Sequence, residues 1–194
     1  MRNKLIRSAV LGGVVVFLWS SFSWMVLPWH QVSFKQFQNE EKVAEVIREN
    51  APESGIYILP NTCAYNKSCD ATNHEAKNRA AEGKEKMALG PVVFASVQPF
   101  GVDPNMSRPI FFAVLMNIIG AFIITWMVAK LNTTYWGNVG YVVMMGLLVG
   151  LLGLLPEWNW WNFSLSYVIV GIMDLIIGWF FGGVVIARIL AKRA

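Results

Sequence analysis

Charged residues are scarce in this chain, and their scarcity excludes an ordinary soluble domain. Lys, Arg, Asp and Glu make up only 14% of the sequence, whereas a soluble domain usually carries about 25%. Hydrophobic residues make up 55%, and the mean hydropathy is +0.46. Such an excess of apolar residues is expected where long segments of a chain lie in a lipid bilayer.

The residue types that carry catalysis are also scarce. The sequence has two histidines, His30 and His74, and two cysteines. It contains no Ser/His/Asp pattern, no histidine-rich metal motif, no glycine-rich phosphate loop and no dinucleotide fingerprint. We therefore predict a non-enzymatic protein without a cofactor or a bound metal. A lipid-acting enzyme that uses His30 or Glu157 at the membrane surface is an alternative.

Four apolar stretches account for the high hydropathy. Each is within the roughly 17–25 residues of a spanning helix. They are Ala9–Leu27, Ile110–Ala129, Val139–Leu155 and Phe163–Ile186. Pro156–Asn162 is the predicted link between the last two, and Trp29–Arg108 is a polar segment between the first two. The fold predicted is an α-helical membrane protein with transmembrane helix 1 in residues 1–28, a small α+β extracytoplasmic domain in 29–108 and transmembrane helices 2–4 in 109–194.

The basic residues indicate the orientation of the helices. Lys and Arg collect at the cytoplasmic ends of membrane helices, and here they flank the apolar stretches at Arg2, Lys4, Arg7, Lys130, Arg188, Lys192 and Arg193. With four crossings these positions share one side, so we predict both termini in the cytoplasm and residues 29–108 outside. That outer segment has nine basic and ten acidic residues, so we predict no nucleic-acid partner.

A cleaved signal peptide is the alternative for the first stretch. Arg2 and Lys4 form a basic start, Ala9–Trp19 forms an apolar core, and Ser21–Ser23 is a small-x-small cleavage site. The apolar run continues to Leu27, which favours an uncleaved helix.

The outer segment has the pattern of a helix, a strand, a second helix and a second strand. Ser33 stands three residues before Gln36, a capping-box spacing that predicts a helix over 33–50. Strands are predicted over 55–60 and 91–97, and the second helix over 73–87. About 75 residues are few for an independent core, so we expect this segment to rest on the membrane helices or on a partner.

Two cysteines lie in a polar turn of the outer segment. Exported compartments are oxidising, so Cys63 and Cys69 are predicted to form a disulfide. The alternative is a metal site that adds His74 and His30. Zinc sites usually space their cysteines by two to four residues and use four ligands, and this pattern fits that rule less well.

Asp174 is the one charged residue inside an apolar stretch, and an intramembrane charge is by default a functional hypothesis. Glycines recur beside it at helical spacing, and two of them form a GxxxG pattern. A second GxxxG pattern occurs in the third stretch. The glycines predicted to pack helices are Gly146, Gly150, Gly171, Gly178 and Gly182.

A polar layer is predicted around this acid. Counted at about 1.5 Å per residue from the helix ends, Ser20, Ser23 and Asn117 lie at a depth similar to that of Asp174. One interpretation is a structural hydrogen-bond network with a neutral Asp174. The other is proton or substrate handling.

Short motifs along most of the chain resemble those of a known family. They are Met25–Pro28, Gly55–Tyr57, Gly90–Pro91, Trp158–Phe163 and Gly178–Trp179 with Gly182. With these motifs the chain resembles an uncharacterised family of small bacterial inner-membrane proteins with four transmembrane helices. The resemblance implies an inner-membrane location with residues 29–108 in the periplasm, and it implies no activity. The turn at Cys63–Cys69 is not part of the pattern.

These observations together predict an accessory or scaffold subunit of the bacterial inner membrane. Its partners would be the lipid bilayer and a membrane or periplasmic protein that binds the periplasmic domain. The alternative is a small transporter or proton-coupled membrane component that uses Asp174.

Overall fold

The computed structural model describes residues 2–61 and 74–191. The described chain is mostly helical and divides into two compact units. One unit is Gln36–Pro104, and the other, here called the bundle, is formed by the described residues up to Lys35 and from Asn105 on. The elements of the bundle are α1 (Arg2–Val26), η1 (Gln31–Ser33), α4 (Ser107–Val128), α5 (Tyr135–Trp161) and α6 (Leu165–Leu190). The elements of the unit Gln36–Pro104 are α2 (Glu40–Asn50), β1 (Gly55–Leu59), α3 (His74–Leu89) and β2 (Val93–Val97).

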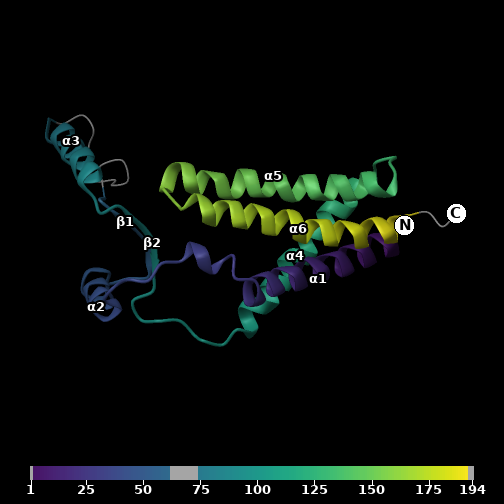
Figure 1. Cartoon of the computed structure of the whole chain (residues 1–194), viewed down its shortest axis with the longest axis horizontal. Helices are drawn as coiled ribbons and strands as arrows, with labels where there is room; N and C mark the ends of the chain where they lie inside the picture. The colour runs from purple at the N-terminus through teal and green to yellow at the C-terminus, as the bar shows by residue number, and fades with distance from the viewer. Residues whose placement is uncertain (1, 62–73, 192–194) are drawn as a thin grey trace. The chain divides into compact units, whose positions relative to one another are not determined.

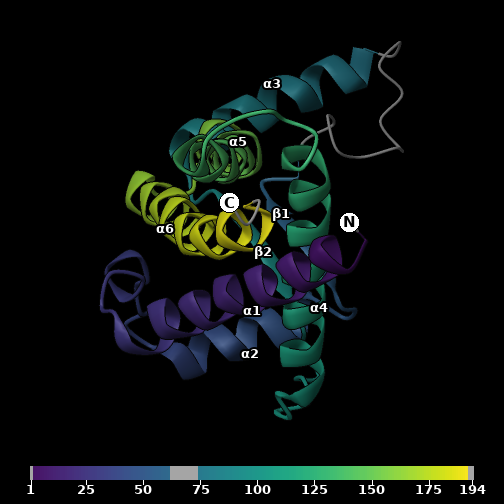
Figure 2. The same ribbon diagram turned by 90° about the vertical axis from the view of Figure 1, so that its right-hand side faces the viewer.

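The four long helices of the bundle are each long and apolar enough to cross a membrane. This confirms the four apolar helices predicted from the sequence. Helices α5 and α6 lie side by side, and α1 packs against α6 (Figure 1). Figure 2 shows α4 crossing α1 steeply, and α4 makes few contacts with α5. The start of α1 and the end of α6 lie at the same end of the bundle (Figure 1).

Helix α5 is longer than its apolar stretch. Pro156 lies inside it, and the helix runs to Trp161, so the prediction of a link over 156–162 was wrong for residues 156–161. Proline removes a single helical hydrogen bond, and the helix continues for five residues beyond it. The helix ends at Asn162, which has a left-handed backbone and donates its N–H to the Glu157 carbonyl. Ser164 then caps α6 by accepting a hydrogen bond from the Tyr167 N–H, so the turn between the two helices is short.

Consecutive glycines in α1 let two helices approach it at once. A Cβ at Gly12 would lie 2.7 Å from Cγ1 of Ile186 in α6, and a Cβ at Gly13 would lie 2.6 Å from the Ile118 Cα in α4. The α1–α4 crossing is therefore a contact between two backbones. Around it lies an apolar core made by Val16, Ala121, Ile124, Val128, Val142, Trp179 and Ile186.

The five glycines predicted to pack helices all lie against a neighbouring helix. Their partners are Trp179 for Gly146, Ile172 for Gly150, Leu154 for Gly171, Trp19 for Gly178 and Val16 for Gly182. Two of these partners belong to α1 and one to α5, so the glycines of α6 serve two interfaces rather than one continuous face.

The unit Gln36–Pro104 has the predicted order of helix, strand, helix and strand. Its strands pair antiparallel, with Gly55 opposite Val97 and Leu59 opposite Val93. The predicted helix start at Ser33 was wrong, because α2 begins at Glu40. There Asn39 caps the helix by accepting a hydrogen bond from the Lys42 N–H at 2.9 Å. An Asn side chain at this position satisfies a free N–H of the first turn.

The two cysteines lie outside the described residues. The predicted disulfide between Cys63 and Cys69 therefore stays a prediction. The same holds for the alternative metal site, because the side chain of His74 is also outside the described part.

Candidate functional site

The segment that follows α1 folds against the bundle. The Gln31 N–H donates to the Pro28 carbonyl at 3.1 Å and closes a turn. Beyond it, η1 lies beside the first turns of α6, where Ser33 Oγ is 3.4 Å from Ser166 Oγ and the ring of Phe34 meets that of Tyr167. Residues 29–35, which the sequence placed in the outer domain, therefore belong to the bundle.

This turn places a histidine among hydrogen-bonding side chains. His30 Nε2 lies 2.9 Å from Ser23 Oγ, and Trp29 Nε1 donates to the same Ser23 Oγ at 2.9 Å. Ser23 has no exposed surface, and His30 is only 6% exposed. Because an indole N–H can only donate, the serine accepts from Trp29. Its own hydrogen is then free to bond the imidazole when Nε2 is unprotonated.

Asp174 of α6 lies near the same nitrogen of this histidine. Trp19 Nε1 donates to Asp174 Oδ1 at 2.7 Å and also approaches the Asp174 backbone carbonyl at 3.1 Å. Oδ2 lies 3.9 Å from His30 Nε2, and the Asp174 side chain is 12% exposed. The acid thus points into the bundle and contacts the first long helix, as the sequence predicted. Its partners are an indole and an imidazole.

Aromatic rings enclose this group of polar side chains. The Trp24 ring stacks on His30, with centroids 4.0 Å apart and planes 13° apart, and the Trp29 ring meets His30 edge-on. Trp19 packs against Phe181 at 5.3 Å between centroids. Electrostatic interactions are stronger in such a water-poor site than in water. We call Trp19, Ser23, Trp24, Trp29, His30 and Asp174 the His30–Asp174 cluster.

Two residues of the predicted polar layer lie outside the cluster. Asn117 Nδ2 donates to the Ala113 carbonyl of its own helix at 2.9 Å. It lies beside Gly13, which is about 15 Å along α1 from Ser23. Ser20 is half-buried and does not share these hydrogen bonds. Since α4 crosses α1 steeply (Figure 2), depth counted along one helix does not equal depth along the other.

The cluster contains a serine, a histidine and an aspartate, but its geometry differs from that of a hydrolase. In a catalytic triad the serine and the acid bond opposite nitrogens of the imidazole. Here Ser23 Oγ and Asp174 Oδ2 both lie nearest to His30 Nε2. Over residues 2–61 and 74–191, no group of three or more His, Cys, Asp and Glu side chains could hold a metal ion. The arrangement brings an acid within 3.9 Å of a histidine, and it ties the turn after α1 to α6.

Sequence reasoning missed His30, Trp19 and Trp29 as members of the site. The available signal was position along the chain, because His30 follows the first apolar stretch by three residues. An indole in an apolar span requires an acceptor for its N–H, and Asp174 is the acidic acceptor that the spans offer.

Similarity to known proteins adds no information on this cluster. Comparison with protein-family models, with curated proteins and with solved structures finds no match to this chain. The resemblance of its short motifs to a family of inner-membrane proteins therefore stays a prediction.

Proposed function

We propose that this chain is a non-enzymatic accessory or scaffold subunit of the bacterial inner membrane. In this proposal the four apolar helices span the bilayer, both termini are cytoplasmic, and the unit Gln36–Pro104 binds a protein partner in the periplasm. The length and composition of the helices support the membrane location. The basic residues at the helix ends support the orientation.

The observation that carries partner binding is an apolar groove on α2. It has a volume of about 480 Å³ and is lined by Phe37, Gln38, Asn39, Lys42, Val43, Val46 and Ile47. Phe37 is 66% exposed and Val46 is 53% exposed, although acidic residues cover other sides of the same helix. Apolar side chains gathered in this way on the surface of a small unit are typical of protein-binding sites. A partner that brings its own apolar side chains would remove them from water.

A photo-crosslinking residue placed at Val46 in the full-length protein tests this proposal in living cells. We expect one protein adduct that mass spectrometry identifies. The matched control is the same crosslinker at Glu41, which lies on α2 but outside the groove and should give several-fold less adduct. Equal yields from both positions would contradict the proposal. So would crosslinks that join Val46 only to the chain's own bundle.

A second candidate function is a proton-coupled membrane component that uses Asp174. The pairing of His30 with Asp174 in a largely buried cluster supports it, because a buried acid and base are costly to desolvate and are often retained for a function. An Asp174→Asn variant can still accept from Trp19 but cannot exchange a proton. It should therefore lose pH-dependent growth or uptake while it remains folded.

The matched control for this candidate is Asp174→Leu. Asp174→Leu removes the carboxyl acceptor of the Trp19 N–H and leaves it only the backbone carbonyl of residue 174 at 3.1 Å, so it should destabilise the bundle more than Asp174→Asn does. Wild-type behaviour of Asp174→Asn in every growth and uptake assay would remove the candidate and leave the cluster with a structural role. An equal loss of growth or uptake in Asp174→Asn and Asp174→Leu would favour proton handling.

A further inference from the structure

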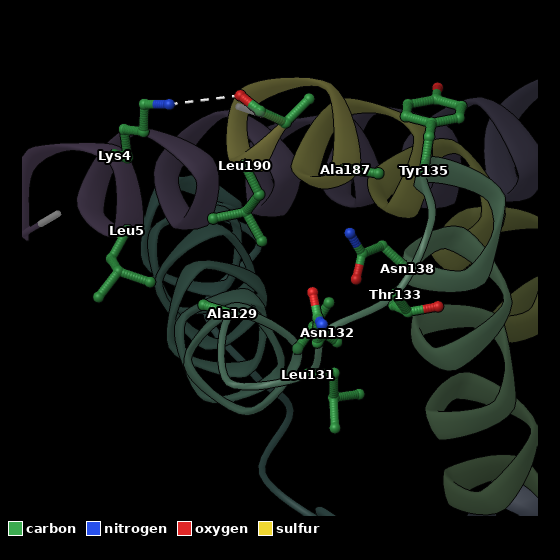
Figure 3. Close-up of a pocket in the computed structure, with 12 residues that line it drawn as sticks. Lys4, Leu5, Ala129, Leu131, Asn132, Thr133, Tyr135, Asn138, Ala187 and Leu190 are labelled. Carbon is green, nitrogen blue, oxygen red and sulfur yellow. Dashed lines mark hydrogen bonds between the residues drawn. The ribbon is translucent and has the colours of Figure 1, made fainter. Parts of the chain in front are cut away.

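A second site lies at the end of the bundle where α1 begins and α6 ends. Here a pocket of about 460 Å³ is lined by residues of α1, α4, α5 and α6 and of the turn between α4 and α5. This volume falls within the roughly 300–1,000 Å³ typical of small-molecule sites. Figure 3 shows the amides of Asn132 and Asn138 pointing into the space between these elements.

Charge at this end of the bundle is of one sign. Arg2, Lys4, Arg7, Lys130 and Arg188 lie here, and the sequence over 1–39 and 104–156 and after 174 has no Asp or Glu. Lys4 lines the pocket, and its Nζ lies 3.3 Å from the Ala191 carbonyl (Figure 3). A ligand in this pocket would therefore carry negative charge near the ammonium group.

Acceptor and donor groups without partners lie at and below the pocket. Asn138 lines it, and its Oδ1 is buried without a hydrogen-bond partner among the described residues. The same is true of Ser8 Oγ and Thr125 Oγ1, which lie one helical turn deeper than Lys4 and Val128. A buried polar atom without a partner is destabilising, because it has lost its hydrogen bonds to water. A ligand with hydroxyl or amine donors would supply the partner that Asn138 lacks.

Apolar grooves adjoin the pocket on two sides. One, of about 230 Å³ between α4 and α5, shares Val128 and Leu131 with it. The other, of about 530 Å³, shares Tyr135 and is otherwise lined by apolar side chains and Arg188. A small free anion would make no use of these grooves. An acyl chain that extends from a bound headgroup would fill them.

We propose that this pocket binds the headgroup of an anionic glycerophospholipid of the phosphatidylglycerol type. The phosphodiester lies beside Lys4, a headgroup hydroxyl donates to Asn138 Oδ1, and the acyl chains follow the two grooves. Basic pockets between transmembrane helices commonly hold anionic headgroups. The site is separate from the groove on α2 and does not depend on a protein partner.

The test uses the full chain, purified in a mild detergent, stripped of lipid and mixed with phosphatidylglycerol or phosphatidylcholine of matched chains. Native mass spectrometry counts the lipids retained on each molecule. We expect phosphatidylglycerol to be retained about tenfold more than phosphatidylcholine. Lys4→Gln should lower this retention about fivefold, the effect expected for one basic residue near anionic lipid. Asn138→Asp, which sets a negative charge against the phosphate, should lower it at least as much.

Lys130→Gln is the matched control. Lys130 lies at the same end of the bundle, but its ammonium stacks over the Trp126 ring at 4.1 Å and does not line the pocket, so this variant should retain lipid like the wild type. Equal losses in the two lysine variants would overturn the proposal in favour of surface charge alone. Equal retention of the two lipids would also overturn it. Displacement by millimolar glycerol phosphate or inorganic phosphate would assign the pocket to a small anion instead. Lys4 is exposed, so Lys4→Gln decides the question even where Asn138→Asp does not fold.

Discussion

At the scale of single residues, the buried carboxyl group of Asp174 depends on an indole. The Trp19 N–H donates to it at 2.7 Å, whereas His30 Nε2 at 3.9 Å is beyond hydrogen-bonding distance. A hydrogen bond contributes about 0.5–1.5 kcal/mol to stability, and leaving a buried acceptor without its donor costs about 1–3 kcal/mol. The stability of the cluster should therefore respond more to Trp19 than to the aromatic rings that only pack.

Trp19→Phe is the variant that isolates this hydrogen bond. It keeps an aromatic ring beside Phe181 and removes the donor together with part of the indole ring, so it should lower the free energy of unfolding by about 1–3 kcal/mol. Denaturant unfolding in micelles, followed by circular dichroism, measures the change. Trp24→Phe is the control, because Trp24 stacks on His30 and is 48% exposed. A loss of the same size in both variants would show that packing alone holds the acid.

The sequence identified Asp174 because an acid in an apolar stretch is conspicuous, and it identified Ser23 because of its depth along the first stretch. It could not identify His30 as their partner. The contact joins residues 144 positions apart and depends on a turn after Pro28 that folds back on α6. No periodicity within one helix records such a turn. The pairing of Asn117 with this layer failed for the related reason that crossing helices do not share one depth scale.

At the scale of elements, the contact between α1 and α4 depends on a missing side chain. A Cβ at Gly13 would lie 2.6 Å from the Ile118 Cα and 2.8 Å from the Asn117 carbonyl oxygen. Both neighbours are backbone atoms, so they cannot move aside without shifting a helix. The two helices would have to separate.

Gly13→Ala should therefore weaken the bundle by about 1–3 kcal/mol, the usual cost of overpacking. Thermal unfolding in the same micelles measures it. Gly140→Ala in α5 serves as the control, since a Cβ there meets no atom of the described chain within 4 Å. Alanine favours a helix by up to about 1 kcal/mol over glycine, so the control should be neutral or stabilising. Similar melting temperatures for the two variants would refute the close crossing.

Within α3, the hydrogen bond from Lys86 and the positive charge of that group hold the pKa of Glu82 below its ordinary value. Their charged atoms are 2.6 Å apart. Because the pKa of Glu82 is lower in the folded helix than in the unfolded chain, the pair stabilises the helix fully at pH values above the unfolded pKa of Glu82. This contribution is lost as the pH falls through the lowered value.

Lys86→Gln should consequently raise the pKa of Glu82 toward its ordinary value, as measured by NMR titration of the Glu82 carboxyl. Both side chains are well exposed, so high salt should reduce the difference between variant and wild type. Lys84→Gln, two residues away and on another side of the helix, should leave the pKa unchanged. An unchanged pKa in Lys86→Gln would show that the pair does not persist in solution.

The elements were predicted more reliably in their order than in their ends. Apolar length predicts four long helices, and alternating breakers predict the two strands of the unit Gln36–Pro104. The ends depend on single capping interactions instead. Ser33 and Asn39 are both good capping residues, and the structure uses Asn39 for α2 while Ser33 lies in η1 beside α6. A choice of this kind is decided by tertiary contacts that the local sequence does not show.

At the scale of the whole molecule, an even number of spanning helices requires the two ends of the chain to share one side. In the proposed orientation, the basic residues place that side in the cytoplasm. A fluorescent protein that folds only in the cytoplasm should be bright when fused after Ala194. Alkaline phosphatase, which is active only in the periplasm, should be active when fused after Pro104. The reverse pair of results would invert the proposed orientation.

The two neighbouring glycines of α1 also bear on how the protein is made. Translation adds about 5–20 residues per second, so α1 leaves the ribosome roughly ten to thirty seconds before Ile186, the partner of Gly12, is synthesised. Its partner helix α4 also comes later, whereas α5 and α6 follow one another directly and can pair at once. During synthesis, α4 can therefore cover Gly13 before α5 and α6 are complete, whereas Gly12 waits for Ile186. Of these four helices, α1 is made first but completes its contacts only when α6 is present, so errors in biogenesis should concentrate at the surface around Gly12.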